Sequence, residues 1–265
     1  DYKPAIYNLA TVTRLLEGPA AAKREYLAIL EKDRTEIKAM SELATLALRE
    51  GKTREAINWL DRASKTSPTA ITPQLRLVNL LLQERQLTEA MQIMESLENR
   101  APRNFSVLDT KARIQLANGN QADAIQTYRT AANIAANNAA LLFRISQIQI
   151  SLQDLQGAAT SLRYAVNLDP KILPAQASLA RLTYDLDGFE AAMKMVTALQ
   201  EKFPGSSAAD TVRGDVLMRH KRYGDAIAAY DAAFGKSRTS KQAQRLFRAR
   251  WASGDRAAAV DGLDS

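Results

Sequence analysis

Apolar residues return along the chain at spacings of three and four residues, in short segments separated by polar turns. In the segment REAINWLDRAS, Ile57, Leu60 and Ala63 fall on one side of a helix. The segments ADAIQTYRTAA (122–132) and GDAIAAYDAAF (224–234) repeat the same order of Ala, large residue and small residue. This spacing is typical of an amphipathic α-helix, so the pattern predicts many short helices with one apolar face each.

The pattern returns with a fixed period of 56 − 22 = 34 residues and no insertion. One column holds Ala22, Ala56, Ala90, Ala124, Ala158, Ala192 and Ala226. Four positions later a large-residue column holds Tyr26, Leu60, Met94, Tyr128, Leu162, Val196 and Tyr230. Earlier in each unit a slim column holds Ala10, Ala44, Val78, Ala112, Ser146, Ala180 and Gly214. A period of this length indicates a repeat architecture.

Turn residues divide each repeat into two helices. Glycine-containing turns are expected at Gly51, at Gly119, at Asp187-Gly188 and at Tyr223-Gly224. Near the end of the repeat a proline is expected to stop the second helix. This column holds Pro68, Pro102, Pro170 and Pro204, with Arg34, Ala136 and Arg238 in the other repeats. Because one helix pair cannot bury its apolar face alone, the pairs are predicted to stack into a solenoid.

These columns resemble those of the tetratricopeptide (TPR) repeat family over residues 3–263. The second half of each repeat follows the family pattern well, and the first half follows it loosely. The family's Trp column holds Ile6, Met40, Gln74, Leu108, Leu142, Gln176 and Asp210. The resemblance implies an all-α, right-handed TPR superhelix of about one turn, with sixteen helices in eight pairs.

We predict one solenoid domain over residues 1–265, with seven full repeats and a shortened eighth in which Ala259 stands near the expected Ala position. The predicted repeats are 3–36, 37–70, 71–104, 105–138, 139–172, 173–206, 207–240 and 241–265.

Composition narrows the function. The chain has no cysteine, which excludes disulfides, a thiolate nucleophile and a cysteine metal site. The net charge of +7 favours anionic partners. Nucleic acid is not expected, because the positive charge is not interleaved with stacking aromatics. No apolar run approaches the ~18 residues of a membrane span. The start at Asp1, without Met or signal peptide, suggests a mature form or a fragment of a longer protein.

Candidate catalytic chemistry is sparse. His220 is the single histidine, and one histidine without convergent ligands does not make a metal site. It is better explained as part of a cationic cluster at a helix C-terminus. The glycines occur singly, with neither a dinucleotide-binding motif nor a P-loop. We therefore predict a non-enzymatic protein without metal or cofactor.

In the TPR family, ligands bind in a concave groove lined by the first helix of each repeat. The matching positions include Arg76, Asn79, Arg113, Phe143, Arg144, Gln147, Arg181 and Tyr184. Arginine can pair bidentately with carboxylate or phosphate, so an extended protein or peptide partner, or an acidic polysaccharide, is expected. Alternatively, these arginines only solvate an exposed helix face. The two-carboxylate clamp of chaperone-binding relatives is missing, because its positions hold Tyr7, Thr11, Ser41 and Thr45.

Residues 172–260 resemble more closely the TPR lipoproteins of the PEP-CTERM system (PrsT type). The similar segments are Gly214 to Met218, Leu246 to Ala249 and Ala252 to Asp255. This resemblance implies a periplasmic scaffold for exopolysaccharide or PEP-CTERM protein export, held at a membrane only through an anchor outside this sequence. A cytoplasmic TPR adaptor, or a targeting domain of a larger enzyme such as a glycosyltransferase, remains an alternative.

Overall fold

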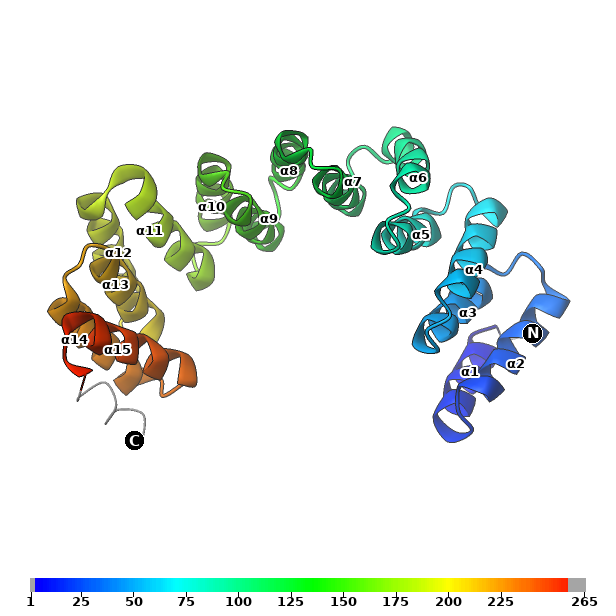
Figure 1. Cartoon of the computed structure of the whole chain (residues 1–265), viewed down its shortest axis with the longest axis horizontal. Helices are drawn as coiled ribbons and strands as arrows, with labels where there is room; N and C mark the ends of the chain where they lie inside the picture. The colour runs from blue at the N-terminus through cyan, green and yellow to red at the C-terminus, as the bar shows by residue number, and fades with distance from the viewer. Residues whose placement is uncertain (1–2, 257–265) are drawn as a thin grey trace. The chain divides into compact units, whose positions relative to one another are not determined.

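The computed structural model describes residues 3–256, and this part of the chain consists of fifteen helices without a strand (Figure 1). The first helices of successive repeats are α1 (Lys3–Leu16), α3 (Ile37–Arg49), α5 (Ile71–Gln83), α7 (Phe105–Ala117), α9 (Ala139–Ser151), α11 (Leu173–Asp187), α13 (Ser207–Arg219) and α15 (Ser240–Ser253). The second helices are α2 (Pro19–Lys32), α4 (Thr53–Thr66), α6 (Leu87–Arg100), α8 (Gln121–Ile134), α10 (Leu155–Leu168), α12 (Phe189–Lys202) and α14 (Tyr223–Lys236). Fifteen helices in consecutive pairs confirm the predicted all-α fold class of TPR solenoids.

The 34-residue period sets where helices begin. The second helices begin at residues 19, 53, 87, 121, 155, 189 and 223, each 34 residues after the one before. The sixteenth helix and Ala259 of the shortened eighth repeat lie outside the described residues. Packing contacts divide the chain into two compact units, Asp1–Tyr128 and Arg129–Ser265, with the boundary inside α8. The single domain and the one-turn superhelix therefore stay predictions.

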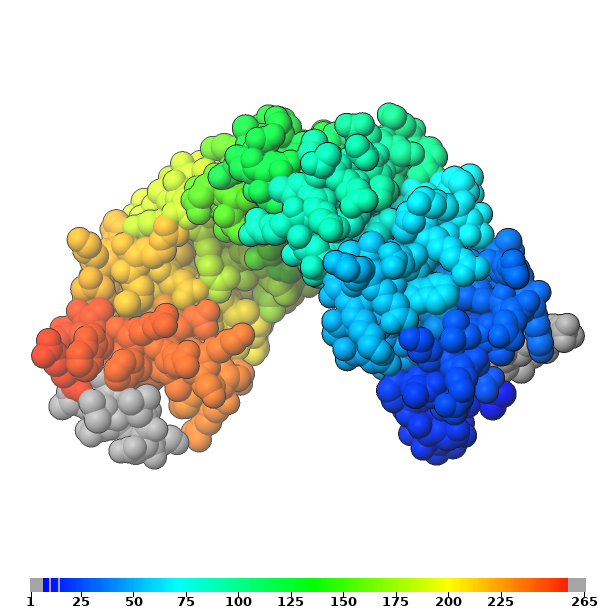
Figure 2. Space-filling model, turned by 45° about the vertical axis from the view of Figure 1, so that its right-hand side comes forward, coloured from blue at the N-terminus to red at the C-terminus, as the bar shows by residue number. Residues whose placement is uncertain are grey.

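The repeated columns form the core of both units. Every member of the Ala column is fully buried, and the large residues four positions later are at most 4% exposed. A helix pair is thus joined by a small residue that permits close approach and a large one that fills the space beside it. In Figure 2 the colours within each unit follow one another in chain order, so segments that are consecutive in the sequence lie side by side.

Gly214 is the extreme case of the slim column. It lies on α13 beneath the ring of Tyr230 on α14, and a Cβ added to it would overlap that ring. In the N-terminal unit the same pair of columns holds Ala112 and Tyr128, both buried. Removing one methyl group from the slim column therefore lets Tyr230 lie directly on α13.

The turn between the two helices of a repeat needs one residue in the left-handed region. Gly51 (φ 72°) and Gly119 (φ 81°) supply it without strain. At the same register in other repeats this conformation falls on Arg85 (φ 61°), Gln153 (φ 63°) and Lys221 (φ 61°). A residue with a Cβ is strained there, by roughly 1–2 kcal/mol.

The expected turn at Tyr223-Gly224 is wrong, because α14 already begins at Tyr223. The turn lies at His220-Lys221-Arg222, and Lys221 takes the left-handed conformation. The repeat register, rather than the nearest glycine, fixes the turn. The glycine turns expected at Gly51, Gly119 and Gly188 are confirmed by positive φ angles.

Proline is not required to end the second helices. Helix α2 ends at Lys32 and α14 at Lys236, two residues before Arg34 and Arg238, which occupy the proline column. The helices before Pro68 and Pro204 end at the same register. The backbone carbonyl group in the proline column accepts a hydrogen bond from the next repeat. The Pro68 carbonyl accepts from Gln74 Nε2 (2.8 Å). Pro170 accepts likewise from Gln176 Nε2 (2.6 Å). Both glutamines stand in the family's Trp column, so a hydrogen bond joins the repeats where the family has an indole.

Candidate functional site

On the first-helix face of the N-terminal unit, each arginine predicted for the groove is bonded to the preceding repeat. Arg76 on α5 donates to the Ser41 carbonyl (3.2 Å) and to Thr45 Oγ1 (2.7 Å) on α3. Arg113 on α7 donates to Asn79 Oδ1 (2.5 Å) on α5. The acceptor oxygens belong to neutral groups, so these hydrogen bonds link neighbouring repeats without an ion pair.

The C-terminal unit links its first helices mainly through carboxylates. Arg181 on α11 donates its Nε to Asp215 Oδ2 (2.6 Å) on α13. In the opposite direction Arg219 on α13 forms an ion pair with Asp185 on α11. Both pairs are 34 residues apart, because that offset places side chains at equal height on neighbouring first helices.

The remaining predicted groove residues lie on α9 and α11. Gln147 contacts Ser178 Oγ at 3.5 Å. The guanidinium carbon of Arg219 lies 4.6 Å from the Tyr184 ring centroid, a cation–π distance. Phe143 is half-buried on α9, and its neighbour Arg144 is exposed.

Arg76, Asn79 and Arg113 thus lie in the N-terminal unit and the other five residues in the C-terminal unit. Their assignment to a ligand groove stays a prediction.

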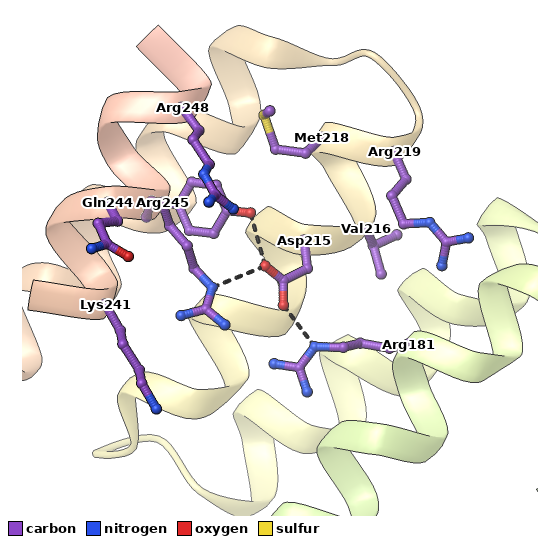
Figure 3. A pocket seen from close by; sticks show the side chains of 10 residues that line it. Arg181, Asp215, Val216, Met218, Arg219, Lys241, Gln244, Arg245 and Arg248 are labelled. Atoms are coloured by element: carbon purple, nitrogen blue, oxygen red, sulfur yellow. Dashed lines mark hydrogen bonds and ion pairs between the residues drawn. The ribbon is translucent and has the colours of Figure 1, made fainter. Parts of the chain in front are cut away.

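A pocket lies apart from most of the residues predicted for the groove. It has a volume of about 640 Å³ and lies among α11, α13 and α15 of the C-terminal unit (Figure 3). Its lining consists of Arg181, Asp215, Val216, Met218, Arg219, Tyr230, Lys241, Gln244, Arg245 and Arg248. We call it the C-terminal pocket. Of the eight candidate groove residues named above, Arg181 lines it, and Asp215 also stands at a position that matches the family's groove.

Asp215 lies at the centre of this pocket and accepts from three donors (Figure 3). These are Arg181 Nε (2.6 Å), the Tyr230 hydroxyl (2.9 Å) and Arg245 Nε (3.3 Å). Burial, and then the negative charge of Asp215 and its hydrogen bond, raise the pKa of Tyr230 well above its ordinary value. Tyr230 therefore remains a neutral hydroxyl donor. One carboxylate on α13 holds side chains from α11, α14 and α15 together.

The pocket is strongly basic. Its lining carries five cations and one carboxylate, which gives 5 − 1 = +4. Lys241, Gln244 and Arg248, all on α15, are exposed and have no hydrogen-bond or ion-pair partner among residues 3–256. Charge left unpaired in a pocket attracts anions.

The sequence carried two signals for this pocket that the groove prediction did not use. The first is the pairing of opposite charges at an offset of 34 residues, Arg181 with Asp215 and Asp185 with Arg219. The second is the set of basic residues on one side of α15, at positions 241, 245 and 248. Basic residues at spacings of three and four fall on one helix face.

A second polar cluster lies in the C-terminal unit, around Asp154. This residue is only 5% exposed and caps α10 by accepting from the Gly157 amide (3.2 Å). Arg129 donates to both of its oxygens, at 2.6 and 3.0 Å, and Gln149 Nε2 lies at 3.4 Å. Burial alone would raise the pKa of Asp154, but the hydrogen bonds and the charge of Arg129 outweigh it, so the pKa lies below its ordinary value.

His220 packs against two aromatic side chains. Its ring stacks on Phe189, with centroids 3.9 Å apart and planes at 14°, and meets the edge of Tyr184 at 6.4 Å. The residue forms the C-cap of α13, as the helix-terminus interpretation expected. No group of three or more His, Cys, Asp or Glu side chains in residues 3–256 is arranged to hold a metal ion.

Known proteins share this architecture. A tetratricopeptide repeat model matches residues 47–114, and a model of a tetratricopeptide repeat-like domain matches residues 135–252. The C-terminal part of a TPR repeat-containing protein from Cytophaga hutchinsonii is 15% identical, with a TM-score of 0.63 over 91% of this chain and 99% of that one. PilF from Pseudomonas aeruginosa is 14% identical, with a TM-score of 0.52 over 80% of this chain and 96% of that one.

A tetratricopeptide repeat protein from Parabacteroides merdae is also 14% identical, with a TM-score of 0.50 over 92% of this chain and 96% of that one. No curated protein sequence matches this chain. Within residues 3–256, no helix is both long and apolar enough to cross a membrane. At this level of identity the structural likenesses show a shared fold. The two matched repeat models and the helix pairs that begin every 34 residues support a tetratricopeptide repeat protein with this solenoid fold.

Proposed function

We propose that this protein is a non-enzymatic scaffold that binds an extended acidic segment of a partner protein along its first helices. The fold generally serves protein–protein interaction. The observation that carries the acidic partner is the C-terminal pocket, where five cationic side chains surround a single carboxylate. A net charge of +7 over the whole chain acts in the same direction.

Successive first helices offer repeated contacts to an extended chain. Arg76 and Arg113 project from α5 and α7, and Arg181 and Arg219 project from α11 and α13. Each exposed charge contributes only about 0.2–1 kcal/mol. Several together give weak binding that depends on ionic strength. Within each unit, a linear acidic segment suits this arrangement, because it meets one repeat after another.

The cellular setting is a further part of the proposal. The resemblance of residues 172–260 to TPR lipoproteins of the PEP-CTERM system supports a periplasmic scaffold in exopolysaccharide or protein export, anchored through a segment outside this sequence. An acidic polysaccharide is the second candidate partner. It is favoured by the same basic residues.

Binding of a labelled oligo-glutamate peptide, followed by fluorescence anisotropy at low and at high salt, tests the proposed function. We expect weak binding at low salt that is largely lost at high salt. An oligo-glutamine peptide of the same length is the matched control, and hyaluronate is the polysaccharide probe. Equal binding of the two peptides, or no binding of oligo-glutamate, would rule out the acidic protein partner. Binding of hyaluronate alone would favour the polysaccharide.

A further inference from the structure

We infer that the C-terminal pocket is a specific site for neighbouring carboxylates of an acidic peptide, and that Asp215 positions the arginines that read them. This inference rests on the proposed function. It names the pocket among α11, α13 and α15 as the place where the acidic segment is held most tightly.

Asp215 accepts a hydrogen bond only from the Nε atom of each of the two arginines, Arg181 and Arg245. Arg181 donates Nε to Oδ2 and Arg245 donates Nε to Oδ1. Neither guanidinium uses its terminal Nη groups on a described residue, and Figure 3 shows these ends within the pocket. The Nη pair of a guanidinium matches the two oxygens of a carboxylate. Asp215 therefore fixes two arginines and leaves their forked ends available.

Tyr230 and Gly214 fix Asp215 in turn. The Tyr230 hydroxyl donates to the same Oδ1 that accepts from Arg245. Tyr230 is 4% exposed. Its ring can pack against α13 only because Gly214 has no Cβ. A buried, hydrogen-bonded aromatic side chain loses little entropy when a ligand binds, because it is already ordered. The anion site is thus built before the ligand arrives.

The unpaired cations, Lys241 and Arg248, lie on α15, the helix that also carries Arg245. Lys241 and Arg248 line the pocket on either side of Gln244 (Figure 3). A second carboxylate next to the first would meet these charges. Gln244 has both an amide donor and an acceptor free to pair with a peptide group. Met218, which is half-buried, supplies apolar surface in the same pocket. Apolar contact together with amide pairing favours a peptide over a uniformly hydrated polysaccharide.

The test compares variants in binding of the oligo-glutamate peptide. The double variant Lys241→Gln/Arg248→Gln removes two exposed charges, and we expect roughly tenfold weaker binding and a smaller salt dependence. The matched control is Arg163→Gln/Lys194→Gln. It also removes one arginine and one lysine charge, from exposed positions on α10 and α12 of the same unit, outside the pocket. We expect less than a twofold change for the control.

Asp215→Asn separates positioning from charge. This variant makes the pocket more positive, so simple attraction predicts tighter binding. Loss of the carboxylate that orients Arg181 and Arg245 predicts weaker binding instead, by about fivefold. Circular dichroism of each variant checks that the helices remain folded.

The outcomes are distinct. Wild-type binding that the double variant and its control weaken equally would overturn the pocket and leave the proposed function intact. Tighter binding by Asp215→Asn would overturn the positioning role. Failure of the wild type to bind oligo-glutamate would overturn both the pocket and the acidic protein partner. If inorganic phosphate competed at a concentration equal to that of the peptide's carboxylate groups, the site would be a nonselective anion site. That result would overturn the assignment to a peptide.

Discussion

The two units share their apolar columns and differ in their polar contacts. In the N-terminal unit, Arg76 and Arg113 reach across first helices to neutral oxygens. In the C-terminal unit, Arg181 and Arg219 reach across the same kind of interface to carboxylates. The apolar repeat therefore builds one scaffold in both units. The polar positions decide whether its surface only joins repeats or also forms a charged pocket.

The two tyrosines of the large-residue column show how small this difference is. Tyr128 donates to Asp109 on α7 (3.0 Å), and Tyr230 donates to Asp215 on α13 (2.9 Å). Tyr230 lies over Gly214, whereas the equivalent slim-column residue in the repeat of Tyr128 is Ala112. Only Asp215 also accepts from arginines on both neighbouring first helices. A similar hydroxyl–carboxylate bond is thus a structural contact in one unit and the centre of a pocket in the other.

The two tryptophans allow the units to be followed separately. Trp59 packs against the core of the N-terminal unit, and Trp251 lies on α15, 5.8 Å from Phe247. These are the two tryptophans of the sequence. Fluorescence of Trp251→Phe protein therefore reports on the N-terminal unit, and that of Trp59→Phe protein on the C-terminal unit.

The largest expected effect is that of Gly214→Ala. Glycine to alanine usually stabilises a helix by about 0.5–1 kcal/mol. Here the new Cβ overlaps the buried Tyr230 ring, and overpacking costs about 1–3 kcal/mol. We expect net destabilisation of about 1–2 kcal/mol, measured as a lower urea midpoint for Trp251 fluorescence with little change for Trp59.

Gly235→Ala is the matched control for that variant. Gly235 lies on α14 of the same unit, and a Cβ there would meet nothing within 4 Å. We expect this change to raise the midpoint, because only helix propensity is altered. If Gly214→Ala raised the midpoint as Gly235→Ala does, the close contact between α13 and Tyr230 would be wrong.

A smaller effect is expected for Asp154→Asn. Asparagine still caps α10, but the ion pair with Arg129 is lost. The pKa of Asp154 is lowered in the folded state, so its charge stabilises the C-terminal unit above the unfolded-state pKa. That contribution is lost as pH falls through the folded-state pKa. We expect a destabilisation of about 1 kcal/mol at pH 7 that shrinks below about pH 4, followed through Trp251.

The pH dependence of unfolding of the Asp154→Asn variant should differ between the two units. The equivalent caps of α4 and α6 in the N-terminal unit are Lys52 and Gln86, neither of which makes a side-chain cap hydrogen bond. Asp154→Asn should therefore leave the Trp59 transition unchanged at every pH. A difference between wild type and variant that stayed constant from pH 7 to pH 3 would contradict the assigned pKa direction.

The sequence predicted the helix pairs and their core, because burial of Ala56, Leu60 and their equivalents follows from periodicity alone. The pocket was harder to predict. It depends on how Arg181 and Arg245 divide their nitrogen atoms around Asp215, and no spacing rule specifies that choice. The failed turn at Gly224 has a similar origin. Packing of the helix pair holds Lys221 in a conformation that its own backbone preference opposes.

The smallest predicted effect concerns the turn between the paired helices, where the two units should respond equally to substitution. Arg85 and Lys221 occupy the left-handed turn position, at φ 61° in both cases, in the N-terminal and C-terminal units respectively. Replacing either by glycine removes the steric cost of the Cβ, and the greater freedom of the unfolded chain offsets part of the gain. We expect Arg85→Gly and Lys221→Gly each to stabilise its own unit by about 0.5–1 kcal/mol.

Trp59 and Trp251 fluorescence in urea would measure the two effects separately. Gly51→Ala, at the same register with φ 72°, is the reverse control and should destabilise the N-terminal unit by a similar amount. Since the turn lies outside the charged pocket, its energetics should depend on backbone geometry and be equal in both units. A stabilising effect in only one unit would show that the local polar contacts, rather than the shared repeat register, set the strain.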